Sequence, residues 1–187
     1  AEAFGILQQT GKVRAFGVSN MTPMQIQLLQ RYVKQPLVAN QLQLSIAHCS
    51  MISQGIYTNM ELDGAIDRDG SILDFCRLKD ITIQTWSPFQ FGYMNGVFLD
   101  HPDFPELNRV LHEIADKYSV TPTTIAMAWI LRHPARMQPI TGTMRIERLK
   151  DCIKAAEIML TRDEWYALYV AAGNGLPCKP QKNQATS

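Results

Sequence analysis

The sequence has almost no net charge and no long apolar run, and both absences exclude classes of partner. Its 187 residues include 18 lysines and arginines against 17 aspartates and glutamates, so the formal net charge is +1. No strong electrostatic field therefore attracts nucleic acid or an anionic membrane surface. No apolar run reaches the ~20 residues that a membrane-spanning helix needs. We therefore expect no nucleic-acid partner and no membrane partner.

Cysteine is scarce and shows no ligand or disulfide pattern. The 4 cysteines are Cys49, Cys76, Cys152 and Cys178. No C-x-x-C pair and no matching pair of histidines accompanies them, so the sequence predicts neither a zinc site nor a disulfide framework. Free thiols are typical of a reducing compartment, and we expect a cytoplasmic location.

Short apolar segments alternate with helical patterns along the chain, which is long enough for one globular domain. The pattern predicts strands at about 13–18, 37–44, 81–86 and 137–141, and predicts helices between and after them. Threonines stand where three of the helix N-caps are expected, at Thr22, Thr121 and Thr161. Residues 45–69 and 89–105 are predicted to be loops. Loops of this length are usually functional or mobile.

The alternation indicates an α/β fold with a parallel sheet and helical crossovers. A doubly wound sheet and a (β/α)8 TIM barrel both fit this pattern. A barrel needs eight strands and about 250 residues, so four strands would form only its half. The opening AEAFGILQQTGK has the pattern of the end of a helix that stops at Gly11, and we expect a chain that begins inside a larger fold. We expect one domain over residues 1–173 and a polar tail over 174–187.

The segment over residues 137–152 has the pattern of an anion site. A strand-like stretch runs into the small residues around Gly142, and Arg145 and Arg148 then accompany the start of a helix. A helix N-terminus presents unpaired N–H groups and a partial positive charge. Gly142 lets a ligand approach the backbone, and arginines are fork-shaped phosphate donors. Nucleotide phosphates fit this arrangement. An ordinary βα loop with exposed arginines is the alternative.

Polar and aromatic side chains also stand at or near the ends of the other predicted strands. Ser19 and Asn20 follow the first strand, Gln41 lies in the second, and Trp86 ends the third. Side-chain amides offer the donors and acceptors that a carboxamide requires, and tryptophan offers a flat face. Separately, these residues could be a turn, a satisfied polar group in the sheet and a core side chain. Together with the anion site they favour a nicotinamide nucleotide across the strand ends.

Four segments resemble consecutive motifs of the aldo-keto reductases, in the order and spacing of that family. They are GKVRAFGVSN, PLVANQLQLS, ITIQTWSP and PITGTMRIERL, and the resemblance extends over about residues 11–173. It is nearest to a bacterial oxidoreductase branch. It implies an NADP(H)-dependent oxidoreductase that reduces aldehydes or ketones by hydride transfer on a (β/α)8 barrel. This chain would be the carboxyl-terminal half of that barrel.

The resemblance also implies which residues contact the cofactor. The nicotinamide carboxamide would be held by Ser19, Asn20 and Gln41, the nicotinamide ring would stack on Trp86, and the pyrophosphate would lie along Ser87 and Phe89. The adenosine end would be contacted by Gly142, Thr143 and Met144, the 2′-phosphate by Arg148 with Arg145 as a second contact, and the adenine by Asp151 and Cys152. The chain departs from the common pattern at Cys152, where asparagine is more usual, and at Gly142, which is often lysine.

The resemblance implies that the catalytic group is absent from this chain. The family's catalytic Asp, Tyr, Lys and His lie in the first half of the barrel, and we find no replacement for them here. His48 and His101 are expected to be solvated loop residues, whereas Tyr57 and Tyr93 are candidates for lining a substrate pocket. We expect no activity from this chain alone and, as partners, a small carbonyl substrate and the missing amino-terminal half. The alternative is a half barrel that acts as a non-catalytic nucleotide-binding or interaction module, pairing through its sheet edges.

Overall fold

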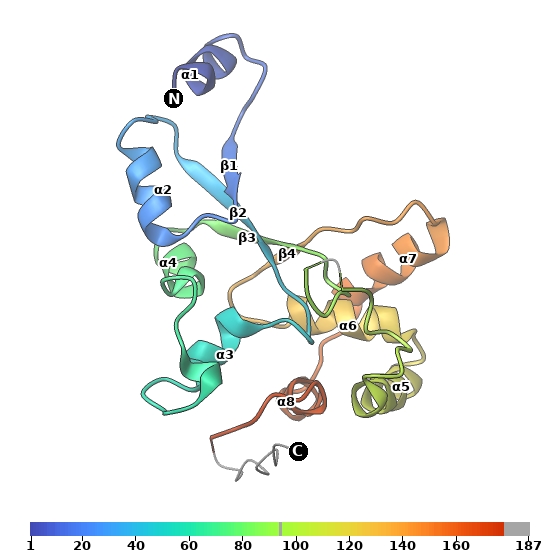
Figure 1. The fold of residues 1–187 in the computed structure, drawn as a ribbon. Coiled ribbons are helices and arrows are strands. Elements are labelled where there is room, and N and C mark those ends of the chain that lie inside the picture. The colour runs from blue at the N-terminus through green and yellow to red at the C-terminus, as the bar shows by residue number, and fades with distance from the viewer. Residues whose placement is uncertain (94, 178–187) are drawn as a thin grey trace.

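The computed structural model describes residues 1–93 and 95–177 and organises them around one parallel sheet (Figure 1). Its strands are β1 (Phe16–Ser19), β2 (Leu37–Gln43), β3 (Thr82–Trp86) and β4 (Gln138–Pro139). Within the described residues they lie in the order β1-β2-β3-β4, and each is parallel to its neighbour. The predicted α/β alternation is therefore confirmed. The strand order does not reverse direction anywhere among these four strands. A doubly wound sheet has such a reversal and binds its ligand there.

One helix precedes the first strand, and the others lie in the connections between the strands or follow the last strand. They are α1 (Glu2–Gln9), α2 (Pro23–Gln30), α3 (Ser50–Ile56), α4 (Ile72–Leu78), α5 (Pro105–Tyr118), α6 (Pro122–Leu131), α7 (Ile146–Lys154) and α8 (Arg162–Ala171), with 3-10 turns η1 (Asp63–Ala65) and η2 (Ala155–Glu157). Figure 1 shows α1 and the N-terminus at one end of the molecule and α8 at the other.

The predicted helix starts are confirmed at three threonines. Thr22, Thr121 and Thr161 each have extended backbone angles, and each hydroxyl accepts a hydrogen bond from the N–H three residues on. At Thr22 and Thr161 the partner side chain also reaches back to the threonine N–H, which completes a capping box. These side chains satisfy N–H groups that a helix leaves without intrahelical partners.

Replacing Thr22 by alanine should lower the free energy of unfolding by about 1 kcal/mol, because α2 loses one of the two bonds of its capping box. Chemical denaturation followed by circular dichroism measures the change. Thr22→Ser keeps the hydroxyl and is the matched control. Equal stability of the alanine and serine variants would show that the cap contributes nothing.

The prediction that residues 45–69 form a loop was wrong, because α3 and η1 lie inside this segment. Helix α3 is short, and its N-cap residue Cys49 makes no side-chain cap hydrogen bond. It forms because Met51 and Ile52 are buried against the core. Tertiary packing therefore determines this helix, since isolated helices of this length are unstable in water.

The fourth strand is shorter than predicted, because only Gln138 and Pro139 belong to it. Pro139 has no N–H to donate to the ladder, so regular pairing with β3 cannot extend through it. The chain still follows β3 for one more bond, from the Ile140 N–H to the Thr85 carbonyl at 2.8 Å.

Two tryptophans hold α6 and α8 together inside the apolar core. The rings of Trp129 and Trp165 stack with their centroids 4.7 Å apart and their planes 8° apart. Each indole N–H donates to the backbone carbonyl of the other tryptophan, at 3.1 and 3.0 Å. Both side chains are buried. The pair thus satisfies both polar N–H groups while burying two large aromatic surfaces.

A row of three glutamines crosses the sheet from β2 to β4. Gln41, Gln84 and Gln138 occupy matching register positions on adjacent strands. The Gln41 side-chain amide donates to Gln84 at 3.0 Å, and the Gln84 amide donates to Gln138 at 2.8 Å. This row therefore provides side-chain hydrogen bonds between strands in addition to the backbone ladder.

The residues at the start of the predicted tail contact the body of the protein. Asn174 donates to the Tyr169 carbonyl at 3.0 Å, and Tyr57 donates its hydroxyl proton to the Gly175 carbonyl at 2.6 Å. Tyr57 is buried, and its candidacy for a substrate pocket stays a prediction. Residues 178–187, including Cys178, lie outside the described residues.

Across residues 1–93 and 95–177, no helix has both the length and the apolar character needed to cross a membrane. In the same residues, no three His, Cys, Asp or Glu side chains gather in a way that could hold a metal ion. Cys49, Cys76 and Cys152 are free and buried.

Candidate functional site

A cavity of about 910 Å³ lies at the carboxyl ends of β3 and β4. Its walls are the end of β3, the loop that follows, the turn after β4 and the beginning of α7. Nine of the residues predicted from the sequence line it: Trp86, Ser87, Phe89, Gly142, Thr143, Met144, Arg145, Arg148 and Cys152. Segments about sixty residues apart in the chain thus meet in one cavity, because parallel strands bring their carboxyl ends to the same edge.

The predicted residues on β1 and β2 lie beside this cavity and do not line it. Asn20 is connected to it directly, since its side-chain oxygen accepts the indole N–H of Trp86 at 3.2 Å. Ser19 donates its hydroxyl proton to the Gln41 carbonyl at 3.4 Å. The side-chain amide of Gln41 donates to Gln84, and its side-chain oxygen accepts no hydrogen bond from the residues that the structure describes.

Asp151, which was predicted to contact the adenine, does not reach the cavity. It is half-buried in α7 and does not line the cavity wall. Its backbone carbonyl accepts the hydroxyl proton of Thr124 at 3.0 Å, which fixes α7 to α6. Its neighbour Cys152 does line the cavity. Burial, and to a lesser extent the charge of Asp151, raises the pKa of the Cys152 thiol. The thiol is therefore a neutral group in the cavity wall and not a thiolate nucleophile.

Backbone geometry fixes the direction of Trp86 and of the chain after it. Asn20 and Ser87 both have left-handed backbone angles, with φ of 53° and 51°. Asparagine adopts this conformation more readily than most residues. The Trp86 indole lies between its hydrogen bond to Asn20 and an edge-on contact with Tyr93, whose ring centroid is 6.2 Å away. Its ring is thus held at the strand end rather than inside the apolar core.

The segment after β3 is anchored at several points, although it contains no helix in its described residues. Gln90 and Val97 form an antiparallel bridge, and the Phe98 N–H donates to the Phe89 carbonyl at 3.0 Å. The Ser45 hydroxyl donates to the Gln90 carbonyl at 2.6 Å. Gln90 and Val97 line the cavity, and sequence reasoning missed both. The only signal was the position of this loop after a strand that ends in the candidate site.

The end of the cavity near α7 is electropositive. Arg145 and Arg148 form no ion pair with any carboxylate in the part of the chain that the structure describes. Helix α7 also has no side-chain cap, so the N–H groups of its first turn are available to an anion. Glu147 in this turn opposes an anion. Asp100, which also lines the cavity, is paired with His112 at 2.8 Å.

Gly142 leaves open space beside the backbone at the same end of the cavity. A Cβ atom built at this position would meet no atom within 4 Å. A ligand can therefore approach the peptide backbone between β4 and α7 closely. The arrangement can bind an extended anionic ligand, with charged groups at α7 and aromatic and amide groups at the ends of β1 to β3.

Two histidines that the sequence placed in solvent are packed instead. His48 is half-buried, and burial lowers its pKa. His101 packs against Phe91 with ring centroids 5.2 Å apart, and its Nδ1 accepts the N–H of Asp103 at 3.2 Å. Both side chains are half-buried, so the expectation that they are solvated is met only in part. Neither histidine lines the cavity at the strand ends.

Comparison with known proteins gives a consistent family relationship. The model of the aldo/keto reductase family matches residues 1–170. A 6-dehydroglucose reductase from Agrobacterium fabrum is 30% identical over 171 residues, which cover 91% of this chain and 50% of that protein. The chain spans about half the length of the first curated relatives it matches.

Solved structures show the same relationship at the level of the fold. A thermostable aldo-keto reductase in complex with the inhibitor epalrestat has a TM-score of 0.66 at 25% identity, covering 91% of this chain and 53% of its own. An aldo-keto reductase from Bombyx mori, solved in complex with NADP, has a TM-score of 0.64 at 21% identity. That match covers 90% of this chain and 48% of the other, and it shows similarity of fold alone.

Proposed function

The chain belongs to the aldo/keto reductase family, and on this premise we propose that it binds NADP(H) for an oxidoreductase that reduces aldehydes or ketones. The observation that carries the proposal is the cavity at the ends of β3 and β4, which gathers an electropositive helix start and an oriented tryptophan. The Bombyx mori protein, which shares the fold, was solved with NADP, so the fold is compatible with this cofactor.

The residues present fit this cofactor at both of its ends. Arg148 and Arg145 supply guanidinium groups for a 2′-phosphate, and the uncapped start of α7 with the open backbone at Gly142 suits the phosphates. At the other end, Asn20 has a side-chain N–H₂ group to donate and Gln41 has an oxygen to accept. A carboxamide needs one donor and one acceptor of this kind.

The role of these residues is to bind and orient. When bound, a reduced nicotinamide supplies the hydride for carbonyl reduction. Trp86 would present its ring to the nicotinamide, and its hydrogen bond to Asn20 fixes the plane of that ring. The anchored loop after β3 would cover the pyrophosphate through Ser87 and Phe89 and keep water from it. This pre-organisation lowers the entropy cost of holding the cofactor in one pose.

We further propose that the described elements form one half of a (β/α)8 barrel. Among the described residues, β1 pairs only with β2, and β4 pairs only with β3. Each therefore has an edge where further strands of a barrel would pair. The general acid of the reaction would then come from residues outside this sequence. The 187-residue chain alone would bind cofactor without reducing a carbonyl compound.

Arg148→Ala should weaken NADPH binding by about 10- to 100-fold, because a hydrogen bond to a charged group contributes about 1.5–3 kcal/mol. NADH lacks the 2′-phosphate, so its affinity should change little. Titration of each cofactor, followed by nicotinamide fluorescence, measures both values. Lys150→Ala is the matched control, since Lys150 lies on the same helix but does not line the cavity.

Three results would count against the proposed function. An unchanged ratio of NADPH to NADH affinity in Arg148→Ala would remove Arg148 from the 2′-phosphate. No saturable binding of either cofactor by the folded chain would show that the strand ends do not form a site by themselves. Robust carbonyl reduction by the chain alone would contradict the proposed origin of the general acid.

A further inference from the structure

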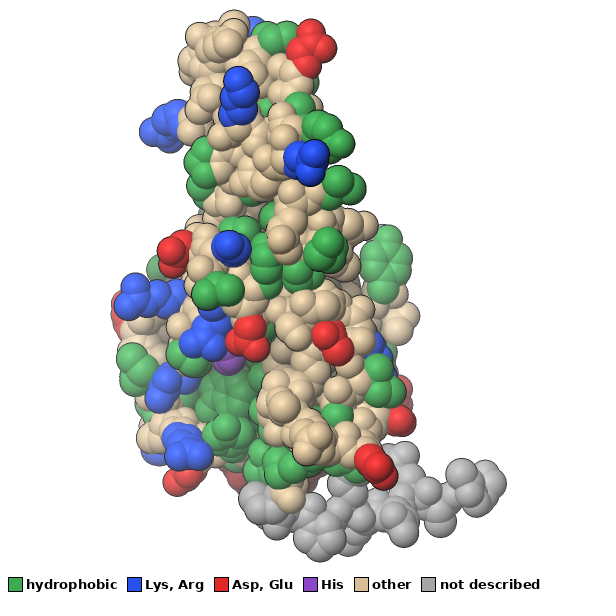
Figure 2. Space-filling model, turned by 90° about the vertical axis from the view of Figure 1, so that its left-hand side faces the viewer, with side chains coloured by type: hydrophobic (Ala, Val, Ile, Leu, Met, Phe, Trp, Pro, Cys, Tyr) green, Lys and Arg blue, Asp and Glu red, His purple; other side chains and the backbone are tan. Residues whose placement is uncertain are grey.

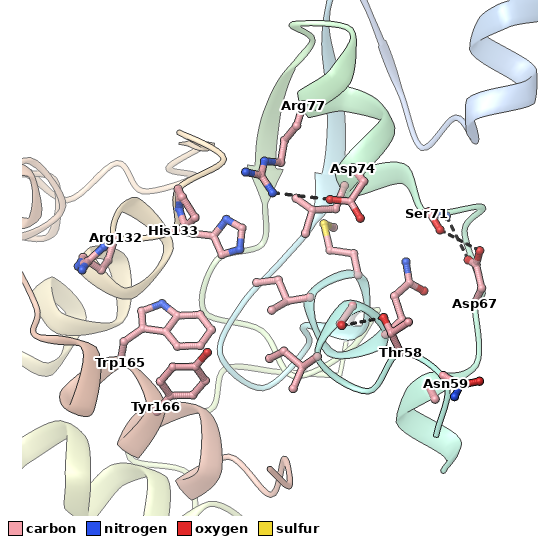
Figure 3. Close-up of a pocket in the computed structure, with 18 of the residues that line it drawn as sticks. Thr58, Asn59, Asp67, Ser71, Asp74, Arg77, Arg132, His133, Trp165 and Tyr166 are labelled. Carbon is pink, nitrogen blue, oxygen red and sulfur yellow. Dashed lines mark hydrogen bonds and ion pairs between the residues drawn. The ribbon is translucent and has the colours of Figure 1, made fainter. Parts of the chain in front are cut away.

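A second cavity, of about 660 Å³, lies among α3, α4, the end of α6 and the beginning of α8 (Figure 3). It shares no lining residue with the cavity at the strand ends. Figure 2 shows the side of the molecule on which α2, α3 and α4 lie. Hydrophobic side chains gather there in a hollow beside a histidine, with basic side chains close by. The proposed cofactor site does not use this cavity.

One wall of the second cavity is apolar and rigid. Met51 and Ile52 of α3 and Leu73 of α4 contribute aliphatic surface, and Trp165 and Tyr166 of α8 contribute aromatic surface. The two rings meet edge to face, with centroids 5.0 Å apart and planes 82° apart. The stacking and hydrogen bonds of Trp165 to Trp129 fix this wall. Such a surface favours an apolar ligand body.

The ring of His133, whose centroid lies 6.3 Å from that of Trp165, provides a neutral hydrogen-bond donor beside the aromatic wall. Its Nδ1 accepts the N–H of Ala135 at 3.2 Å, which places the ring proton on Nε2. Burial, with a smaller effect from the nearby charge of Arg77, lowers the pKa of His133 to about 4. The ring is therefore neutral at pH 7. Figure 3 shows it directed into the cavity, above the rings of Trp165 and Tyr166.

Arg77 provides a cationic donor beside the histidine. Its guanidinium lies 3.6 Å from the Asp74 carboxylate, on the same helix. This separation exceeds that of a hydrogen bond, so the N–H groups of Arg77 are available to a ligand. Figure 3 shows Arg77 and Asp74 at the same edge of the cavity as His133.

The other charged groups around the cavity have partners or stacking contacts of their own. Asp67 accepts three backbone N–H groups and the Ser71 hydroxyl. Arg132 donates to the Leu160 carbonyl, and Arg162 lies over the Tyr166 ring. Three arginines and two aspartates line the cavity, so its net positive charge favours a ligand with a single negative charge. Asp74 would repel the second charge of a dianion, and Arg77 would repel a cation.

We propose that this cavity binds a monocarboxylate with a ring-sized apolar body. Its carboxylate accepts from the Arg77 guanidinium and from His133 Nε2. Its apolar body lies against the aliphatic side chains of α3 and the aromatic side chains of α8. The site does not depend on the proposed cofactor function, because the two cavities have separate walls.

Isothermal titration of the 187-residue chain with 2-naphthoate tests the proposal. We expect saturable one-to-one binding, and at least tenfold weaker binding of 2-naphthamide, which has the same rings without the charge. Arg77→Met keeps the aliphatic stem and should weaken 2-naphthoate at least tenfold. Lys79→Met removes the same charge next to the end of the same helix, outside the cavity, and should leave the affinity unchanged.

A blocking variant locates the ligand independently of charge. Gly55 lines the cavity, and a Cβ atom there would meet nothing within 4 Å. Gly55→Phe has room for its Cβ atom and should abolish binding by adding a ring to the cavity wall, whereas Arg148→Ala should not affect it. Equal binding of naphthoate and naphthamide, or full affinity in both Arg77→Met and Gly55→Phe, would overturn the proposal. Loss of binding in Arg148→Ala would assign the ligand to the other cavity.

Discussion

Replacing Trp129 by alanine is expected to lower the free energy of unfolding by about 4 kcal/mol. The side chain is fully buried in α6 and stacks on Trp165. Removing a large aromatic side chain from a core costs about 3–5 kcal/mol, because transfer free energy is lost and a cavity remains. The substitution also leaves the Trp165 carbonyl without its indole donor.

Thermal unfolding measures this effect, which corresponds to a decrease in Tm of roughly 10 °C for a domain of this size. Trp86→Ala is the control, because Trp86 is half-buried at a strand end rather than in the core. A decrease in Tm of similar size in both variants would show that the pair of Trp129 and Trp165 contributes no more to stability than a half-buried tryptophan does. Trp129→Phe should give an intermediate value, since it retains an aromatic ring but loses the N–H donor.

Glu164→Gln is expected to destabilise the protein by about 2 kcal/mol at pH 7 and to have little effect near pH 2. Burial acts to raise the pKa of Glu164, but hydrogen bonds from Lys117, Thr161 and Tyr118 outweigh it and lower the pKa to about 2. The ordinary value is 4.5. Since the folded pKa is depressed, the stabilisation is present above about pH 4.5 and is lost as the pH falls towards 2.

Denaturant unfolding of both proteins between pH 2 and pH 7 measures this dependence. The two stabilities should converge as the carboxylate is protonated. Glu113→Gln is the control, because Glu113 is an exposed partner of Arg109 on the surface of α5 and exposed pairs contribute little. A constant difference between Glu164→Gln and the parent protein across this range would show that charge is not the cause.

The elements that could be predicted are those whose signals are local. The N-caps at Thr22, Thr121 and Thr161 follow from a few neighbouring residues, and the structure confirms all three. Helix α3 could not be predicted, because its N-cap makes no side-chain bond and its stability comes from distant packing partners. The half-buried position of His48 could likewise not be predicted from its neighbours in the sequence.

The candidate site shows the same division. Residues 142–148 have their own local pattern of glycine, arginines and a helix start, and they do line one cavity. Whether they bind NADP(H) stays a prediction. The loop over residues 88–100 could not be placed from sequence, since Ser45 anchors it from another connection. The second cavity could not be predicted from the sequence, because its walls come from four separate helices.

The glutamine row has a consequence for strand alignment. Gln41, Gln84 and Gln138 meet only when β2, β3 and β4 are in their observed register. A shift of β3 by one residue would turn Gln84 away from its two partners and would turn Ile83, which is buried, to the glutamine face. A misaligned sheet would therefore lose the two side-chain hydrogen bonds of the row, so the three amides favour the observed register of β2, β3 and β4.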